Sequence, residues 1–325
     1  MQAQNQKIVV LGTGGTIAGE SSSASEGLSY KAAQRGIEAL LRSVAEIGQG
    51  LPKALNSYQF ESEQVAQLDS KDMDFATWQH LAQRCQAWLS QADVVAVVIT
   101  HGTDTLEETA YFLSRVVATD KPIVLTCAMR PANFKDADGP QNLRDALTLA
   151  SVAKGAGVWL VAAGEIHHSQ HVQKVHPTRL NAFDSGESGV AGTVTNDQVS
   201  WRSDFAPVAR ADTIDLSRLP DPRSWPWVEV IMNHVQAKPK VVDLLVSAGA
   251  QGIVVAGTGN GSISTDLKEG LMRAQASGVQ IRIASRCNQG PVITTASHIF
   301  PVLAGLSPVK TRVALMLEMA SQTGH

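Results

Sequence analysis

The chain of 325 residues has little of what marks several large classes of protein. Its three cysteines, Cys85, Cys127 and Cys287, form no C-x-x-C pair, so we expect no disulfide framework and expect all three to be structural. No apolar run reaches about 18 residues, the length of a membrane-spanning helix. Lys and Arg number 27 against 30 Asp and Glu, which leaves no basic surface for nucleic acid or an anionic membrane.

The first residues also lack the pattern of an export signal. Positions 1–7 read MQAQNQK, without a basic region, an apolar stretch and a small-residue cleavage site in succession. We therefore expect a cytoplasmic protein, with the periplasm as the alternative if a signal has been removed.

The sequence does contain short apolar runs that alternate with helical patterns, which is typical of βα units and a mainly parallel sheet. Buried strands are predicted at 7–11, 94–100, 123–126, 158–162, 228–232, 252–256 and 281–285. A proline-rich stretch without periodicity, 206–226, interrupts this alternation. The prediction is an α/β protein with a larger, doubly wound N-terminal domain (1–205), a linker (206–226) and a smaller C-terminal α/β domain (227–325).

Helices are predicted between these strands. Apolar residues keep helical spacing over 37–44 and 75–89. Thr105 and Glu108 form a capping-box pattern, which predicts a helix start with Thr105 as its cap. Pro140 suits the first turn of another helix, and Pro308 that of the last one.

Hydroxyl side chains gather in two glycine-rich turns that directly follow predicted strands. The first turn, at 12–19, reads GTGGTIAG, and the second, at 100–105, reads THGTDT. In open parallel sheets ligands bind beyond the carboxyl ends of the strands, so these turns are the first candidates for a site. A hydroxyl beside a carboxylate is also what a base-assisted nucleophile or a positioned water requires.

Each turn also has a purely structural interpretation. Glycine suits a positive φ and threonine makes local hydrogen bonds, while Ser, Thr and Asp commonly cap helices. A nucleotide-binding loop is excluded in the first turn, because G-x-G-x-x-G from Gly12 meets Ile17, and a Walker loop from Gly14 requires Lys where Glu20 stands. The histidines within 167–171 have no completing metal ligand, and His101 is expected to pack rather than act as a base.

In combination, the two turns resemble those of the bacterial-type L-asparaginase family. The resemblance continues through AMRP at 128–131, DGPQN at 138–142 and GTGNG at 257–261, and so it spans nearly the whole chain. It implies an amidohydrolase that converts L-asparagine to L-aspartate and ammonia through a threonine nucleophile and an acyl-enzyme, without metal or organic cofactor. It also implies a homotetramer, a dimer of dimers with the active site at a dimer interface.

The resemblance implies two catalytic groups. The nucleophile matches Thr16, with Tyr30 beside it, and the second group matches Thr103, Asp104 and Lys174. A hydroxyl is a weak nucleophile at neutral pH and requires a proton acceptor, which a desolvated lysine oriented by a carboxylate can supply. The sequence leaves open which threonine attacks first, and we take it to be Thr16.

The substrate-binding residues that the resemblance implies are Gly15, Ser70, Lys71, Gly102 and Ser262. N–H groups in the two turns are expected to stabilise the oxyanion. Lys71 departs from the family, whose members carry Gln, Glu or Ser there, and the segment 286–292 lacks an acidic residue that a neighbouring subunit usually contributes. Both changes remove negative charge near the substrate ammonium and put the affinity for free asparagine in question. Ser262 favours some glutaminase activity.

Two other functions compete with this one. An amidotransferase subunit shares the domain but carries an extra N-terminal domain, whereas the first predicted strand here begins at Lys7. A non-catalytic amino-acid-binding protein would account for Lys71, but not for two retained threonine motifs. The composition of the Ser-rich loop at 20–29, which leads to Tyr30, suggests the hypothesis that this loop closes over the substrate, and the sequence leaves it open.

Overall fold

The computed structural model of the chain describes residues 6–21, 30–46, 50, 52–153, 157–205 and 213–323. The chain divides into two compact units, Met1–Leu216 and Ser217–His325, and each has a sheet of its own. The change of unit falls inside the stretch 206–226, of which 206–212 lie outside the described residues. A linker over the whole of 206–226 therefore stays a prediction.

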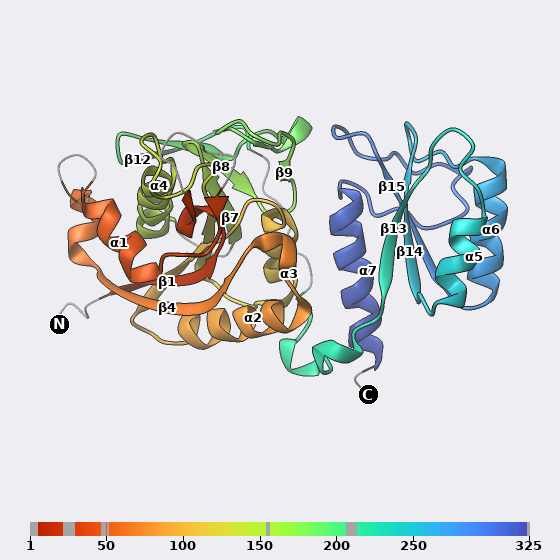
Figure 1. Cartoon of the computed structure of the whole chain (residues 1–325), viewed down its shortest axis with the longest axis horizontal. Helices are drawn as coiled ribbons and strands as arrows, with labels where there is room; N and C mark the ends of the chain where they lie inside the picture. Colours follow the sequence, from red (N-terminus) through yellow and green to blue (C-terminus); the bar gives the residue numbers. More distant parts are fainter. Residues whose placement is uncertain are drawn as a thin grey trace. The chain divides into compact units, whose positions relative to one another are not determined.

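An eight-stranded sheet forms the centre of the first unit (Figure 1). Its spatial order is β12-β11-β8-β7-β6-β5-β1-β4, in which β4, β1, β5, β6 and β7 run parallel and β8, β11 and β12 antiparallel. The bounds are β1 (Lys7–Gly14), β4 (Gln59–Leu68), β5 (Val94–Thr100), β6 (Pro122–Thr126), β7 (Gly157–Ala162), β8 (Glu165–His168), β11 (Gly192–Thr195) and β12 (Gln198–Trp201).

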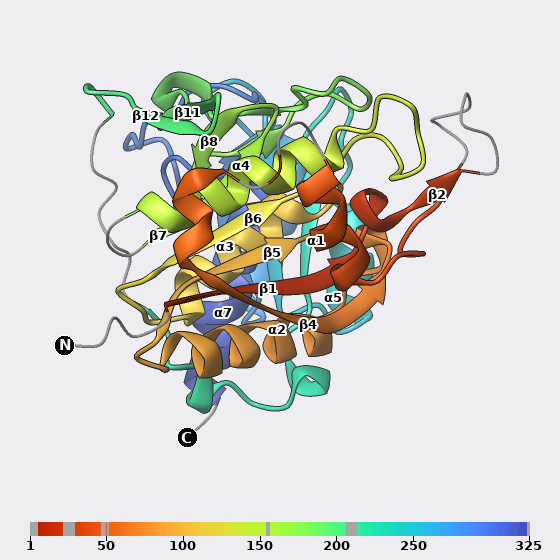
Figure 2. The same cartoon turned by 90° about the vertical axis from the view of Figure 1, so that its left-hand side faces the viewer.

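Helices cover both faces of this sheet (Figure 2). On one face lie α1 (Ile37–Glu46) and α4 (Gly139–Val152), and on the other α2 (Phe75–Leu89) and α3 (Leu106–Val116). Alternate strand residues serve each face, so that Ile8 and Val10 of β1 share a core cluster with Leu40 of α1. On the opposite face Trp78 of α2 stacks on Phe112 of α3, with ring centroids 4.9 Å apart.

The strand order reverses direction between β1 and β5, which are neighbours in the sheet. The chain that leaves β1 returns through β4 on one side, whereas the chain that leaves β5 returns through β6 on the other. The turns after β1 and β5 therefore diverge at the carboxyl edge of the sheet, the place where α/β proteins bind ligands.

Shorter elements surround this edge. Two antiparallel ribbons are formed by β2 (Glu20–Ser21) with β3 (Tyr30–Lys31), and by β9 (Gln173–Lys174) with β10 (Phe183–Asp184). The 3-10 helices are η1 (Thr16–Ala18), η2 (Lys53–Ser57), η3 (Ser70–Asp72), η4 (Gly186–Ser188), η5 (Leu216–Arg218) and η6 (Pro222–Ser224).

The second unit has a parallel sheet in the order β13 (Val228–Met232), β14 (Gly252–Gly257), β15 (Gln280–Ser285). Helix α7 (Pro308–Thr323) covers one face, and α5 (Lys240–Ser247) and α6 (Thr265–Ala276) cover the other (Figure 1). Val242 of α5 and Leu271 of α6 belong to one core cluster with Ile253 and Val255 of β14. Each unit is thus a sheet between two helical layers, and the predicted α/β fold class is confirmed.

All seven strands predicted from apolar runs are present, and so are the helices predicted at 37–44 and 75–89. The pattern does not predict β4, β8, β11 or β12, because strands towards the edges of a sheet mix polar and apolar residues. Cys85 and Cys127 are buried as expected, but Cys287 is exposed, so the prediction of three structural cysteines is wrong for Cys287. Among the described helices, none has both the length and the apolar character to cross a membrane.

Candidate active site

The turn after β1 places a threonine hydroxyl against a tyrosine. Gly14 and Gly15 have φ of 100° and 80°, a region that residues with a Cβ rarely enter, and they lead into η1. Thr16 is 5% exposed, and its Oγ1 lies 2.6 Å from Oη of Tyr30 on β3. Of the loop at 20–29, whose closure over the substrate is a hypothesis, positions 22–29 lie outside the described residues.

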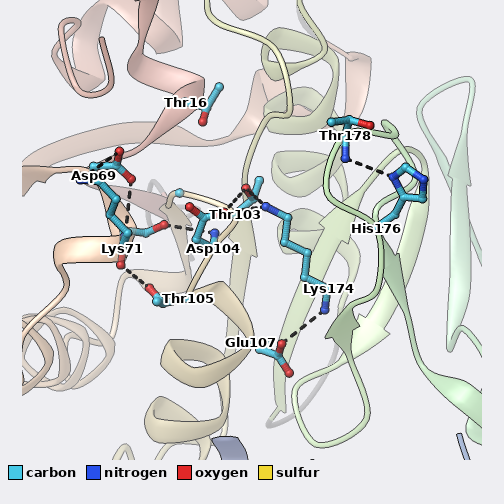
Figure 3. Close-up of polar contacts among 12 residues, drawn as sticks. Thr16, Asp69, Lys71, Thr103, Asp104, Thr105, Glu107, Lys174, His176 and Thr178 are labelled. Carbon is cyan, nitrogen blue, oxygen red and sulfur yellow. Dashed lines mark hydrogen bonds and ion pairs between the residues drawn. The ribbon is translucent and has the colours of Figure 1, made fainter. Parts of the chain in front are cut away.

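The turn after β5 holds the second group (Figure 3). Nζ of Lys174 on β9 donates to Oγ1 of Thr103 at 2.8 Å and pairs with Oδ1 of Asp104 at 2.6 Å. The Lys174 side chain is 16% exposed and that of Asp104 is 53% exposed, so one side of the pair faces solvent. The backbone N–H of Lys174 donates to Oε1 of Glu107 on α3 at 3.4 Å. The structure thus assembles the three residues that the resemblance grouped, with Lys174 and Asp104 70 positions apart.

The two turns touch through their backbones. A Cβ on Gly15 would lie 2.4 Å from both N and Cα of Gly102, and a Cβ on Gly102 would lie 2.5 Å from Oγ of Ser70. Real Cβ atoms essentially never approach other atoms so closely, so both positions require glycine. The glycines therefore allow Thr16, Thr103 and Ser70 to gather at one place.

Ser70 connects η3 to the turn after β5. Its Oγ accepts the backbone N–H of Asp104 at 3.2 Å, and its carbonyl accepts the hydroxyl of Thr105 at 2.7 Å. Thr105 precedes α3 as predicted, but its side chain makes no capping hydrogen bond to that helix. The predicted helix start with Thr105 as its N-cap is therefore confirmed, but the side-chain hydrogen bond of a capping box is absent, because the hydroxyl binds Ser70 instead.

Lys71 adds a cation beside Ser70. Its ammonium pairs with Asp72 and lies 3.5 Å from Oδ2 of Asp69, and its side chain is 59% exposed. The hydrogen bond to Asp72, assisted by the nearby charge of Asp69, raises the pKa of Lys71, so the side chain stays charged. Figure 3 shows Asp69 and Lys71 on one side of Asp104, with Lys174 on the other.

Burial of the phenol raises the pKa of Tyr30 above its ordinary value, and the hydrogen bond with Thr16 opposes this shift. The carboxylates of Asp69 and Asp104 raise that pKa further, whereas Lys71 lowers it. Tyr30 therefore stays protonated at neutral pH, among charges of both signs.

Sequence reasoning missed Asp69 and Glu107. The one signal for Asp69 is its place directly before Ser70.

The remaining candidates lie outside this cluster. His101 is fully buried, with Nδ1 2.7 Å from the carbonyl of Gly102 and Nε2 3.0 Å from Oγ1 of Thr109. Burial lowers the pKa of His101 to about 4, which suits a packing residue. Ser262 belongs to the second unit, where its carbonyl accepts the N–H of Thr258. Within the described residues, no group of three or more His, Cys, Asp or Glu side chains could hold a metal ion.

Known proteins share both units. The family "Asparaginase, N-terminal" matches residues 7–207, and "Glutaminase/Asparaginase C-terminal domain" matches residues 227–325. L-asparaginase 2 of Bacillus subtilis is 35% identical over 96% of this chain and 82% of its own. A glutaminase-asparaginase of Pseudomonas fluorescens biotype A is 35% identical over 96% of this chain and 86% of its own. The structure of a probable cytoplasmic L-asparaginase from Campylobacter jejuni is similar with a TM-score of 0.88 and 33% identity, over 98% of this chain and 96% of that one.

A mainly parallel sheet with two threonine-bearing turns at its switch point is the arrangement of an α/β enzyme that acts on a small molecule. The chain belongs to the asparaginase family. The predictions of this family and of an asparagine-hydrolysing enzyme are confirmed by the relatives, which are L-asparaginases and glutaminase-asparaginases. Neither an amidotransferase subunit nor a non-catalytic binding protein is favoured.

Proposed function

We propose that this enzyme hydrolyses L-asparagine to L-aspartate and ammonia through an acyl-enzyme on Thr16, with L-glutamine as a second substrate. The observation that carries the proposal is the pair of threonine hydroxyls, each with its own hydrogen-bonding partner, in two turns that touch at Gly15 and Gly102. Relatives named glutaminase-asparaginase support the second substrate.

In the first half of the reaction, Oγ1 of Thr16 forms a bond to the amide carbon. Its proton passes to Oη of Tyr30, 2.6 Å away, while Tyr30 gives its own proton to the departing nitrogen. The phenol is suited to this relay because burial raises the pKa of Tyr30, so it carries a proton at the start and at the end. The products of this half are ammonia and an ester on Thr16.

The carbonyl oxygen becomes an oxyanion during this attack. The N–H of Gly15 already donates to the carbonyl of Leu68 at 2.9 Å, and that of Asp104 to Oγ of Ser70 at 3.2 Å. We therefore assign the oxyanion to the neighbouring N–H groups of Thr16 and Thr103. One such donor typically contributes about 100- to 1,000-fold to the rate.

In the second half, water attacks the ester. Thr103 accepts a proton from the water as its own proton moves to Nζ of Lys174, which enters this step as the neutral amine, and Asp104 balances the charge of the ammonium that results. As the ester bond breaks, this proton returns through Thr103 to Oγ1 of Thr16, and L-aspartate leaves. The hydroxyl of Ser70 can donate to the substrate α-carboxylate, since Asp104 N–H uses only its acceptor side. Oδ2 of the exposed Asp104 carboxylate is left for the α-ammonium.

Gly102 and Lys71 are proposed to border this substrate position, and Ser262 is proposed as a further substrate-binding residue. We also propose a homotetramer in the cytoplasm. The Campylobacter jejuni relative is named cytoplasmic, whereas a relative from Haemophilus influenzae is named periplasmic. Light scattering of the purified protein tests the assembly, and fractionation of the source cells tests the compartment.

Ammonia release from L-asparagine, L-glutamine and D-asparagine, by the wild type and by Thr16→Ala, tests the proposal. We expect the fastest release from L-asparagine and a loss of about 1,000-fold or more in the variant. No release with any amide would contradict the enzyme assignment. Undiminished release by Thr16→Ala would contradict only the role of Thr16.

A further inference from the structure

Lys174 lies on a ribbon that is separate from the large sheet. β9 and β10 form a two-stranded sheet of their own, in which Lys174 is opposite Phe183. The N–H groups of Val175 and His176 both donate to the carbonyl of Ala182, at 2.8 and 3.2 Å. These bonds hold the two arms of the ribbon together. They do not determine where the ribbon lies against β5, although Nζ must stay within hydrogen-bond distance of the turn after that strand.

A buried side-chain hydrogen bond joins this ribbon to the large sheet. Ser185 directly follows β10, and its Oγ lies 2.9 Å from Nδ1 of His167 on β8. Ser185 is 5% exposed and His167 is 1% exposed, so neither group can exchange its partner for water without cost. His167 is paired with Leu160 of β7 in the sheet, so the backbone that carries the imidazole is held in place.

The other edge of the imidazole faces a carboxylate. Nε2 of His167 lies 3.6 Å from Oε2 of Glu165, and this contact lowers the pKa of Glu165. Serine, histidine and glutamate are also the groups of a hydrolytic triad, but here Ser185 and His167 are closed to solvent. A substrate carbonyl therefore has no access to Ser185, and the arrangement is suited to holding a position.

We propose that His167 and Ser185 are positioning residues, which hold the β9–β10 ribbon where Nζ of Lys174 reaches Thr103 and Asp104. The inference rests on the proposed function, in which Lys174 takes part in the reaction. In this arrangement β8 of the large sheet supports the position of Lys174, although Lys174 lies on the separate β9–β10 ribbon.

Kinetics of Ser185→Ala in the full chain test this inference. We expect kcat to fall about tenfold with KM changed less than about twofold, because a displaced Nζ affects the chemical step more than binding. Ser169→Ala is the matched control, since Ser169 is also fully buried but its Oγ has no hydrogen-bond partner among the described residues. The control should keep its kcat. An unchanged kcat in Ser185→Ala, or an equal loss in Ser169→Ala, would overturn the inference.

His167 supplies a second pair of variants, which decides the question if Ser185→Ala does not fold. Asn can place a polar atom where Nδ1 lies and Leu cannot, so His167→Asn should keep more of kcat than His167→Leu. Melting temperatures of both variants show whether each is folded at the assay temperature. Equal kcat in the two folded variants would overturn the inference.

A double-mutant cycle with Lys174→Met separates the inference from the proposed function. If Ser185 acts through Lys174, Ser185→Ala should lower kcat in the wild type and leave the slow turnover of Lys174→Met unchanged. The same proportional loss in both backgrounds would overturn the inference while the proposed function stands. Undiminished kcat in Lys174→Met alone would instead overturn the proposed role of Lys174.

Discussion

The turns after β1 and β5 place their threonines in opposite electrical surroundings. Thr16 meets the phenol of Tyr30, which stays neutral because burial raises the pKa of Tyr30. Thr103 meets Nζ of Lys174, which itself lies 2.6 Å from Oδ1 of Asp104. Both turns follow parallel strands that are neighbours in the sheet, so the difference comes from the segments that approach each turn from elsewhere in the chain.

This difference suits two halves of one reaction. A neutral partner can pass a proton from nucleophile to leaving group without keeping a charge. A lysine beside a carboxylate can instead hold a proton while water attacks. The contrast supports the proposed division of labour, in which one hydroxyl serves acylation and the other serves deacylation.

The largest effect is expected when the two threonines are replaced one at a time. Both Thr16→Val and Thr103→Val should lower steady-state kcat by about 1,000-fold. In rapid-quench measurements, Thr103→Val should still release a burst of ammonia close to one equivalent per site, because acylation is intact. Thr16→Val should show no burst. A burst in Thr16→Val and none in Thr103→Val would reverse the two roles.

The contact between the turns is tested by Gly15→Ala. The new Cβ would meet the backbone of Gly102 at 2.4 Å, and φ at this position is 80°, so the free energy of unfolding should fall by more than about 2 kcal/mol. Gly36→Ala is the control, since its Cβ would find its nearest atom at 3.9 Å, and it should change stability by less than about 0.5 kcal/mol. Urea denaturation measures both, and equal stability of the two variants would contradict the packing of the turns.

Removing the phenol hydroxyl tests the neutral partner. Tyr30→Phe should lower kcat by about 10- to 100-fold, because Thr16 loses the group that takes its proton. In the wild type the rate should fall at alkaline pH as the phenol ionises, and the raised pKa of Tyr30 places this fall above the range of an ordinary tyrosine. The variant should lack this alkaline fall. A pH–rate profile with the same fall in both proteins would exclude Tyr30 as its source.

A loss of stability at acid pH is expected from His101 in the turn after β5. Burial lowers the pKa of His101 to about 4, so the unfolded chain binds a proton at a higher pH than the folded protein does. This effect should therefore lower the free energy of unfolding as pH falls from about 6.5 to 4, by on the order of 3 kcal/mol. His101→Gln should flatten this dependence, and the exposed His80→Gln should leave it unchanged. Calorimetry at several pH values distinguishes the two variants.

The smallest effect is expected at Lys71. Lys71→Gln removes a cation that pairs with Asp69 and Asp72. Because this positive charge disfavours the substrate ammonium, KM for L-asparagine should fall about two- to fivefold, with little change in kcat. Lys238→Gln removes an exposed lysine paired with Asp266 in the second unit and is the matched control. A raised KM in Lys71→Gln would mean that the cation assists binding.

Much of this architecture is predictable because the burial of a segment is visible in the apolar pattern of its own residues. The apolar runs predict the seven buried strands, since a strand covered on both faces is apolar along its length. The edge strand β4 is not predictable in this way, because its polar residues are exposed at the end of the sheet. The pattern at Thr105 predicts the helix start correctly but not the hydrogen bond of its hydroxyl, because the carbonyl of Ser70, 35 positions away, accepts that hydroxyl.

By itself, the sequence determined the α/β class, the two hydroxyl-bearing turns and the glycines that mark them, because these depend on neighbours along the chain. The family resemblance named a partner for each hydroxyl, and the tertiary structure decided how those partners reach Thr16 and Thr103. Strand order places the turns after β1 and β5 side by side, and the ribbons carry Tyr30 to Thr16 and Lys174 to Thr103. These partners are far apart in sequence, and no local pattern predicts how the chain between them runs. Close backbone packing at Gly15 and Gly102 then brings the two turns into contact.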